Sequence, residues 1–203
     1  MKKFVRKFHS HEQEKADDAF GAYGRNGGLQ FSYSSKSGII QAWAGGHFSL
    51  KPDVKGNNIF ANFGGGHFGR NFVSFIDITH GGRNYYADVG FVNRIANYDA
   101  KRDTTIRIGF NFAYNETGYS WWFTEGPLNR FGVKTENFLA YDENFHFNEL
   151  NQVGTATWEF KNASRIDLGY SVNKVNLLFP FTFVDESNVE PLPAAGYSYS
   201  NAK

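Results

Sequence analysis

Hydrophobic side chains occupy every second position over several stretches of this chain. Residues 106–114 are the clearest case, because Ile, Phe and Tyr take the even positions while Arg, Gly, Asn and Ala take the odd ones. Residues 166–172 repeat the pattern, and residues 29–33 show it in shorter form. Alternation with a period of two is typical of β-strands that have one apolar and one polar face.

Further strands are predicted at about 39–50, 58–68, 71–79, 119–124, 130–141 and 153–161, with turns such as 115–118 between them. Short turns between successive strands favour an antiparallel meander. We therefore expect an all-β chain in which residues 21–203 form an antiparallel meander of about eight or nine strands. Residues 1–20 are charged and lack apolar periodicity, which predicts a polar flexible or loop segment.

An apolar sheet face must be buried, either against a second sheet or in lipid. The positions between the apolar ones, such as Arg107, Gly109 and Asn111, suit the interior of a barrel better than the surface of a soluble sandwich. The meander is therefore predicted to form part of a transmembrane β-barrel. The residues predicted to face lipid are Ile106, Ile108, Phe110, Phe112, Tyr114, Ile166, Leu168, Tyr170 and Val172.

Aromatic residues make up 18% of the chain, an excess that favours strands over helices. Four of them precede a Gly-Pro turn and are predicted to lie at a membrane interface: Tyr119, Trp121, Trp122 and Phe123. The alternative is a secreted, soluble β-sandwich that binds glycans through exposed aromatic rings, including those of Trp43, Trp121 and Trp122.

Charge and composition narrow the classes of function. A net charge of +1 provides no field to gather nucleic acid, so no nucleic-acid partner is expected. There is no cysteine for a disulfide or a thiolate metal site, and there is no apolar run long enough for a membrane-spanning helix. The basic residues near Met1 lack the apolar core of a signal peptide.

No arrangement of residues indicates an enzyme active site, and no cofactor or metal is predicted. His9, His11 and Glu12 form a weak ligand set, whereas the glycines at 64–66 indicate bulges or close backbone packing. The carboxylates at 142, 143 and 149, and again at 185, 186 and 190, are interpreted as charged loops. Asp88 and Arg94 flank the apolar residues 89–92, and we hypothesise that an ion pair between them holds a tight connection between strands.

Residues 84–94, which read Asn-Tyr-Tyr-Ala-Asp-Val-Gly-Phe-Val-Asn-Arg, resemble a signature in a family of large outer-membrane barrels of Bacteroidota. The resemblance extends from residue 52 to residue 197. It assigns a structural role to Asp88, Gly90, Phe91 and Arg94. Members of that family usually carry an amino-terminal carbohydrate-binding-like domain, similar to family nine modules, and no activity can be carried over from them.

The resemblance implies a bacterial outer membrane as the location. For a barrel wall there, we expect a structural or transport-related role. Family barrels are much longer than this chain, and the sugar-binding-like domain is absent from it. We therefore expect both ends to be internal cuts of a longer protein. The expected partners are membrane lipid and either further strands of the same protein or a partner outer-membrane protein that completes the wall. A role as a subunit of a larger membrane complex belongs to the same expectation.

Overall fold

The computed structural model describes residues 4–6, 12–13, 24–52, 54–87, 94–181 and 192–202, and the described residues contain strands, turns and bends but no helix. The strands are β1 (Phe4–Arg6), β2 (Glu12–Gln13), β3 (Gly24–Ser34), β4 (Ile40–Leu50), β5 (Ile59–Phe68), β6 (Phe72–Gly81), β7 (Ala96–Asp99), β8 (Thr104–Arg107), β9 (Phe110–Trp122), β10 (Leu128–Asp142), β11 (Phe147–Phe160), β12 (Arg165–Asn176) and β13 (Gly196–Ala202).

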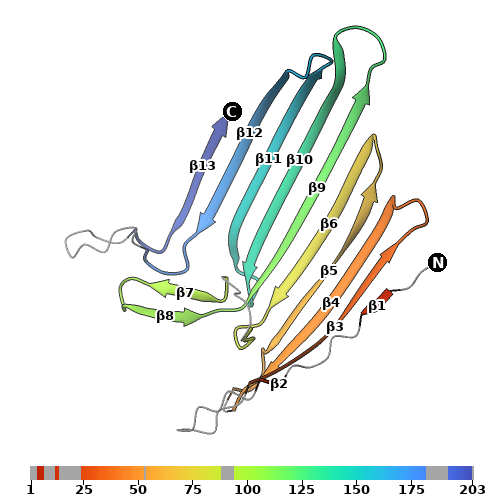
Figure 1. The fold of residues 1–203 in the computed structure, drawn as a ribbon. Helices are drawn as coiled ribbons and strands as arrows, with labels where there is room; N and C mark the ends of the chain where they lie inside the picture. The colour runs from red at the N-terminus through yellow and green to blue at the C-terminus, as the bar shows by residue number, and fades with distance from the viewer. Residues whose placement is uncertain are drawn as a thin grey trace.

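The main sheet is an open antiparallel meander (Figure 1). Its order is β1-β3-β4-β5-β6-β9-β10-β11-β12-β13, and β2 also pairs with β3. Among the described strands, β13 pairs only with β12, so the sheet does not close on itself. The prediction of an all-β antiparallel meander is therefore confirmed, in the form of nine longer strands in a single layer.

One predicted strand is in fact two. The alternating run 106–114 is divided between β8, which pairs only with β7 in a separate two-stranded sheet, and β9, which lies in the main sheet. At the break, the Ile108 amide donates a hydrogen bond to the Ile95 carbonyl at 2.9 Å. Alternation alone cannot reveal this break, because both pieces keep the same period.

The predicted turn at 115–118 is wrong, because β9 runs through these residues without a break. Asn115 and Gly118 pair with β6 on one side and with β10 on the other. Ladder hydrogen bonds from two neighbouring strands outweigh the local preference of an Asn-Glu-Thr-Gly segment for a turn.

Three short strands (β1, β2 and β7) and one longer one (β13) have no counterpart among the predicted strands. The backbones of β1 and β2 pair with β3, within the segment interpreted as polar and flexible. β7 and β8 form their own ribbon, and β13 lies at the edge of the main sheet. In β13 the tyrosines at 197 and 199 do alternate with serine, so its period was available in the sequence.

The register defines two faces, since residues directly opposite each other in an antiparallel pair point to the same side. The apolar face contains the even residues of β4, β6, β11, β12 and β13 and the odd residues of β3, β5, β9 and β10. The remaining strand residues form the polar face. The β10–β11 register shifts between Leu128 and Arg130 and again between Ala140 and Tyr141, so the assignment of these two strands holds between the two irregularities.

The connections at the two ends of the strands differ in length. At the upper end in Figure 1 the links are short, as between β9 and β10 or between β11 and β12. The lower end carries the longest link, residues 82–109, which joins β6 to β9 and includes the β7–β8 ribbon. We call this link the basal connection.

Candidate functional site

The apolar face exposes large hydrophobic side chains on strands from β3 to β12. Leu29 on β3 is 64% exposed, Phe63 on β5 is 55% exposed and Leu168 on β12 is 58% exposed. Among the described strand residues of this face there is no Asp or Glu, and its Lys and Arg residues are Arg25 and Lys174, both near the lower strand ends. Removing this apolar surface from water would be strongly favourable.

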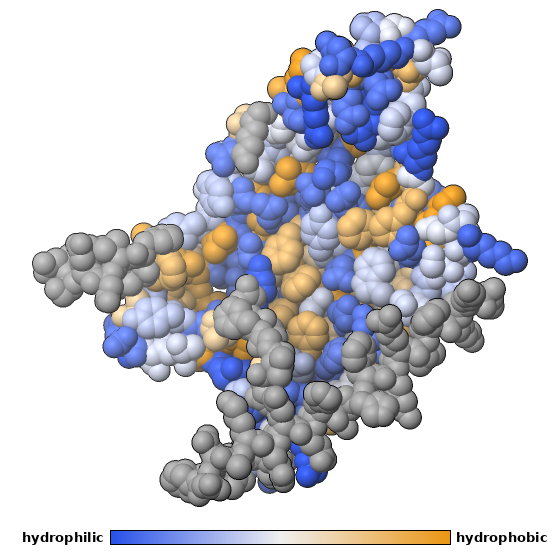
Figure 2. All heavy atoms as spheres, in the orientation of Figure 1, coloured by the Kyte–Doolittle hydropathy of each residue, from blue (hydrophilic) through white to orange (hydrophobic). Residues whose placement is uncertain are grey.

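The polar face carries all the acidic residues of β3–β6 and β9–β13 and most of their Lys and Arg residues, and several of these charges are paired. Arg130 donates two hydrogen bonds to the Glu159 carboxylate, at 3.0 and 2.5 Å. Lys134 lies 3.1 Å from Glu136, and Thr157 donates to Asp167 at 2.6 Å. Space-filling atoms in the orientation of Figure 1 show hydrophobic residues divided by hydrophilic ones (Figure 2).

The pairing of the strands shows that only some of the nine residues predicted to face lipid lie on the apolar face. Ile166, Leu168, Tyr170 and Val172 lie on the apolar face. Phe110, Phe112 and Tyr114 lie on the polar face, whereas Ile106 and Ile108 lie outside the main sheet. The nine residues therefore do not form one apolar surface.

The physical reason is a small core at the lower end of the polar face. Phe110 is buried there, and Phe112 stacks on it with ring centroids 5.8 Å apart. The Tyr114 hydroxyl donates to Glu136 at 3.1 Å, which shows that its neighbours are polar. An apolar alternation thus marks a face that is buried, but does not reveal which of the two faces it is.

The four predicted interfacial aromatics are also divided between the faces. Tyr119 and Trp121 lie on the apolar face near the upper end, and Trp122 lies on the polar face beneath the Arg70 guanidinium, which is 4.7 Å from the ring centroid. Phe123 follows the end of β9. The cause is the twofold period of the strand, which sends adjacent residues to opposite sides.

A row of aromatic rings crosses three strands at the upper end of the apolar face. It contains Tyr119, Trp121, Phe131 and Trp158, and successive ring centroids are 4.7, 5.4 and 5.1 Å apart. We call it the aromatic row. Rings at this position could anchor a sheet at a membrane interface, or stack on a sugar in water.

The basal connection folds over the lower end of the polar face. Its Tyr85 ring lies 5.5 Å from that of Phe60, and the Tyr86 amide donates to the Ser49 hydroxyl at 2.9 Å. Burial raises the pKa of the Tyr85 phenol above its ordinary value, which keeps the hydroxyl protonated. Ile95 of the same connection is only 1% exposed.

Arg94 fixes the far side of the same connection. Its Nη2 lies 2.9 Å from Glu149 Oε2 on β11, and its guanidinium lies 4.6 Å from the ring centroid of Phe138 on β10. Asp88, Gly90 and Phe91 of the predicted structural motif lie outside the described residues. The ion pair that the structure gives Arg94 is therefore with Glu149, and the hypothesis of a pair with Asp88 stays a prediction.

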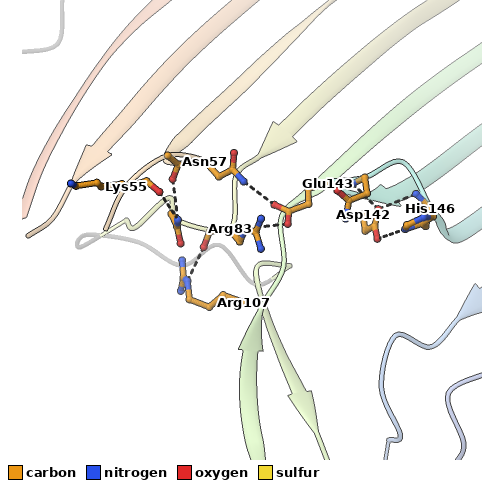
Figure 3. Close-up of polar contacts among 10 residues, drawn as sticks. Lys55, Asn57, Arg83, Arg107, Asp142, Glu143 and His146 are labelled. Carbon is orange, nitrogen blue, oxygen red and sulfur yellow. Dashed lines mark hydrogen bonds and ion pairs between the residues drawn. The ribbon is translucent and has the colours of Figure 1, made fainter. Parts of the chain in front are cut away.

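Polar contacts link the basal connection to the neighbouring turns (Figure 3). Arg83 Nε lies 3.1 Å from Glu143 Oε1, and Asn57 donates to the other oxygen of Glu143 at 3.5 Å. Arg107 donates to the backbone carbonyls of Arg83 and Tyr85 at 2.9 and 2.6 Å. These bonds join three separate turns into one cluster at the lower end.

The interpretation of the carboxylates at 142, 143 and 149 as charged loops holds for Glu143, which lies in the turn after β10, but it is wrong for Asp142 and Glu149, which lie in strands. Asp142 accepts hydrogen bonds from the amides of Asn144 and His146 at 2.8 and 2.9 Å and from the His146 ring at 3.0 Å. Glu149 belongs to β11. The second predicted acidic group, at 185, 186 and 190, lies outside the described residues.

A small cavity of about 170 Å³ remains between the basal connection and the polar face. Arg94, Ile108 and Phe110 line it together with Ala140 and Leu178. In the described part of the chain, no group of three His, Cys, Asp or Glu side chains is placed to hold a metal ion. His47 lies on the polar face and pairs with Phe60, whereas His67 lies on the apolar face and pairs with Ile40. The two histidines therefore cannot share a metal ion.

Comparisons with protein-family models, with curated proteins and with solved structures give no match to this chain. The resemblance to the Bacteroidota barrel family therefore stays a prediction. A bilayer-spanning helix is not found among the described residues.

Proposed function

We propose that this chain forms part of the wall of a bacterial outer-membrane β-barrel, with a structural or transport-related role. The apolar face would contact acyl chains, and the polar face would line the interior. The observation that carries the proposal is the division of charge between the two faces. Acidic strand residues such as Asp77, Glu116 and Glu159 all lie on the polar face, while leucines and phenylalanines stand exposed on the other.

The arrangement of the sheet supports this proposal. In the described residues no second layer covers the apolar face, which a soluble sandwich would require. The basal connection would narrow one mouth of the barrel, since it crosses the lower end of the polar face. Further strands of the same protein, or a partner outer-membrane protein, would pair with the edge at β13 and leave fewer backbone groups unsatisfied in hydrocarbon.

Membrane partitioning tests the proposal. Cells that express the protein are lysed, and their membranes are washed first with high salt and then with alkaline carbonate. The wall of a barrel remains in the membrane pellet and needs detergent for extraction. Release of the folded protein by either wash would contradict the proposal.

The second candidate is a secreted, soluble sandwich that binds glycans. The exposed aromatic row favours it, because aligned rings of this kind stack on sugar faces. In that case the washed protein would be soluble, and a polysaccharide would shift the emission of Trp121 and Trp158. A protein that stays in the pellet after carbonate washing would contradict this candidate.

A further inference from the structure

A row of amide side chains lies at mid-height on the apolar face. Asn115, Asn137 and Gln152 are in register on β9, β10 and β11. Gln152 donates to Asn137 at 3.3 Å, Asn137 donates to Asn115 at 3.4 Å, and Asn115 donates to the Phe75 carbonyl at 2.8 Å. We call these three residues the amide row.

On the side of the amide row toward the upper strand ends, the neighbouring side chains of this face are small. Ser74 and Thr117 share a hydrogen bond of 2.9 Å, and the Thr135 hydroxyl donates to the Thr117 carbonyl at 3.4 Å. At Gly154, beside Thr135, a Cβ atom would meet nothing within 4 Å. The surface is therefore open and low at this point, and another backbone could approach closely.

Amides are poor neighbours for acyl chains. Each amide nitrogen carries two N–H groups, and the contacts above use one of them. The second N–H of each amide is left for another acceptor. Polar groups of this kind are costly in hydrocarbon unless a partner accepts their hydrogen bonds. Between transmembrane helices, small residues combined with Asn, Gln, Ser or Thr are typical of protein contacts inside membranes.

We propose that the amide row is the contact surface for a second copy of this chain, an inference that rests on the proposed membrane location. An amide both donates and accepts, so the row is complementary to itself. Two copies inserted with the same orientation hold each residue at the same depth. A twofold axis along the membrane normal would then bring Asn137 against Asn137 of the second copy.

A partner with a different sequence would need its own polar row at this depth. A charged partner has no counterpart here, because the apolar face carries no Asp or Glu among its described strand residues, and Arg25 and Lys174 lie near the lower strand ends. A second copy of this chain carries a polar row at the same depth, and its row is uncharged.

Cysteine cross-linking in washed membranes tests the inference, since the chain contains no cysteine of its own. Asn137→Cys is expected to form a disulfide-linked dimer under mild oxidation. The matched control is Phe63→Cys, which lies on the same face two strands from β9 and is 55% exposed in the wild-type side chain. The control should remain monomeric.

A second pair of variants measures the contribution of the amides. Asn137→Leu should weaken the dimer roughly three- to thirtyfold in detergent titrations, whereas Asn62→Leu, on the polar face of β5, should leave it unchanged. A monomer in the membrane, equal cross-linking of both cysteine variants, or a cross-link to a different protein would overturn the inference alone. Recovery of the chain in the carbonate wash would contradict the proposed function as well.

Discussion

The indole nitrogen of Trp43 on β4 donates a hydrogen bond of 2.6 Å to Asp77 on β6, two strands away. Gly64 on β5 lies between them in the register, opposite both residues. The indole can cross β5 because this position has no side chain. A Cβ atom at residue 64 would approach ring atoms of Trp43 to 2.7 Å. The glycine run at 64–66 keeps a regular register, so close packing explains it and a bulge does not.

Gly64→Ala should lower the free energy of unfolding by about 1–3 kcal/mol, because the added methyl group displaces a packed ring. The emission of Trp43 should change in the folded protein as its hydrogen bond to Asp77 is lost. Denaturant unfolding followed by tryptophan fluorescence measures both effects. Gly46→Ala is the matched control, since a Cβ there meets nothing within 4 Å. Equal stability of the two variants would contradict this account.

Arg94→Ala should loosen the basal connection. The variant loses the ion pair with Glu149 and the contact with the Phe138 ring, which together contribute about 1–2 kcal/mol at a half-buried site. Limited proteolysis should cut the connection between residues 94 and 109 faster than in the wild type. Arg70→Ala, in a turn at the opposite end, should leave this rate unchanged. Unaltered protection in Arg94→Ala would show that other contacts hold the segment.

The strands of the main sheet could be predicted because most of them alternate over their whole length. Residues 166–172 are an example, since every second side chain there lies on the apolar face. The basal connection could not be predicted in this way. Its β7–β8 ribbon continues the alternation of β9 across Ile108, so the end of one element and the start of the next leave no local signal.

The face of the sheet on which a side chain lies is harder to predict than the position of the strand. Phe112 and Leu168 both stand in alternating runs, yet they lie on opposite faces. The distinction depends on residues distant in sequence. Arg94 lines the cavity beside Phe110 and lies over the Phe138 ring, which in turn contacts Phe112. The amide row was missed for a related reason. Asn115 was interpreted as a turn residue, and only the pairing with Asn137 and Gln152 places it on the apolar face.

Tyr170→Lys tests the lipid-facing role of the apolar face. A lysine on the lipid side near the bilayer midplane destabilises a barrel by about 2–4 kcal/mol, because the ammonium group loses its hydration. Tyr170 is 56% exposed and lies near the middle of β12. Ser171→Lys, its neighbour on the polar face, should be tolerated. The yield of folded protein in washed membranes compares them, and equal yields would argue against lipid contact.

Trp121 and Trp122 offer the sharpest test of the two faces, because they are adjacent in sequence and lie on opposite sides of β9. Lipids brominated near the interface quench only rings that they can touch. If the apolar face lies in the membrane, Trp121→Phe should reduce the quenched part of the emission, and Trp122→Phe should leave that part intact. Trp158, which also belongs to the aromatic row, would account for the remaining quenching. Quenching that is lost equally in both variants would mean that lipid reaches both faces, and quenching that is absent from the wild type would leave the apolar face without lipid contact.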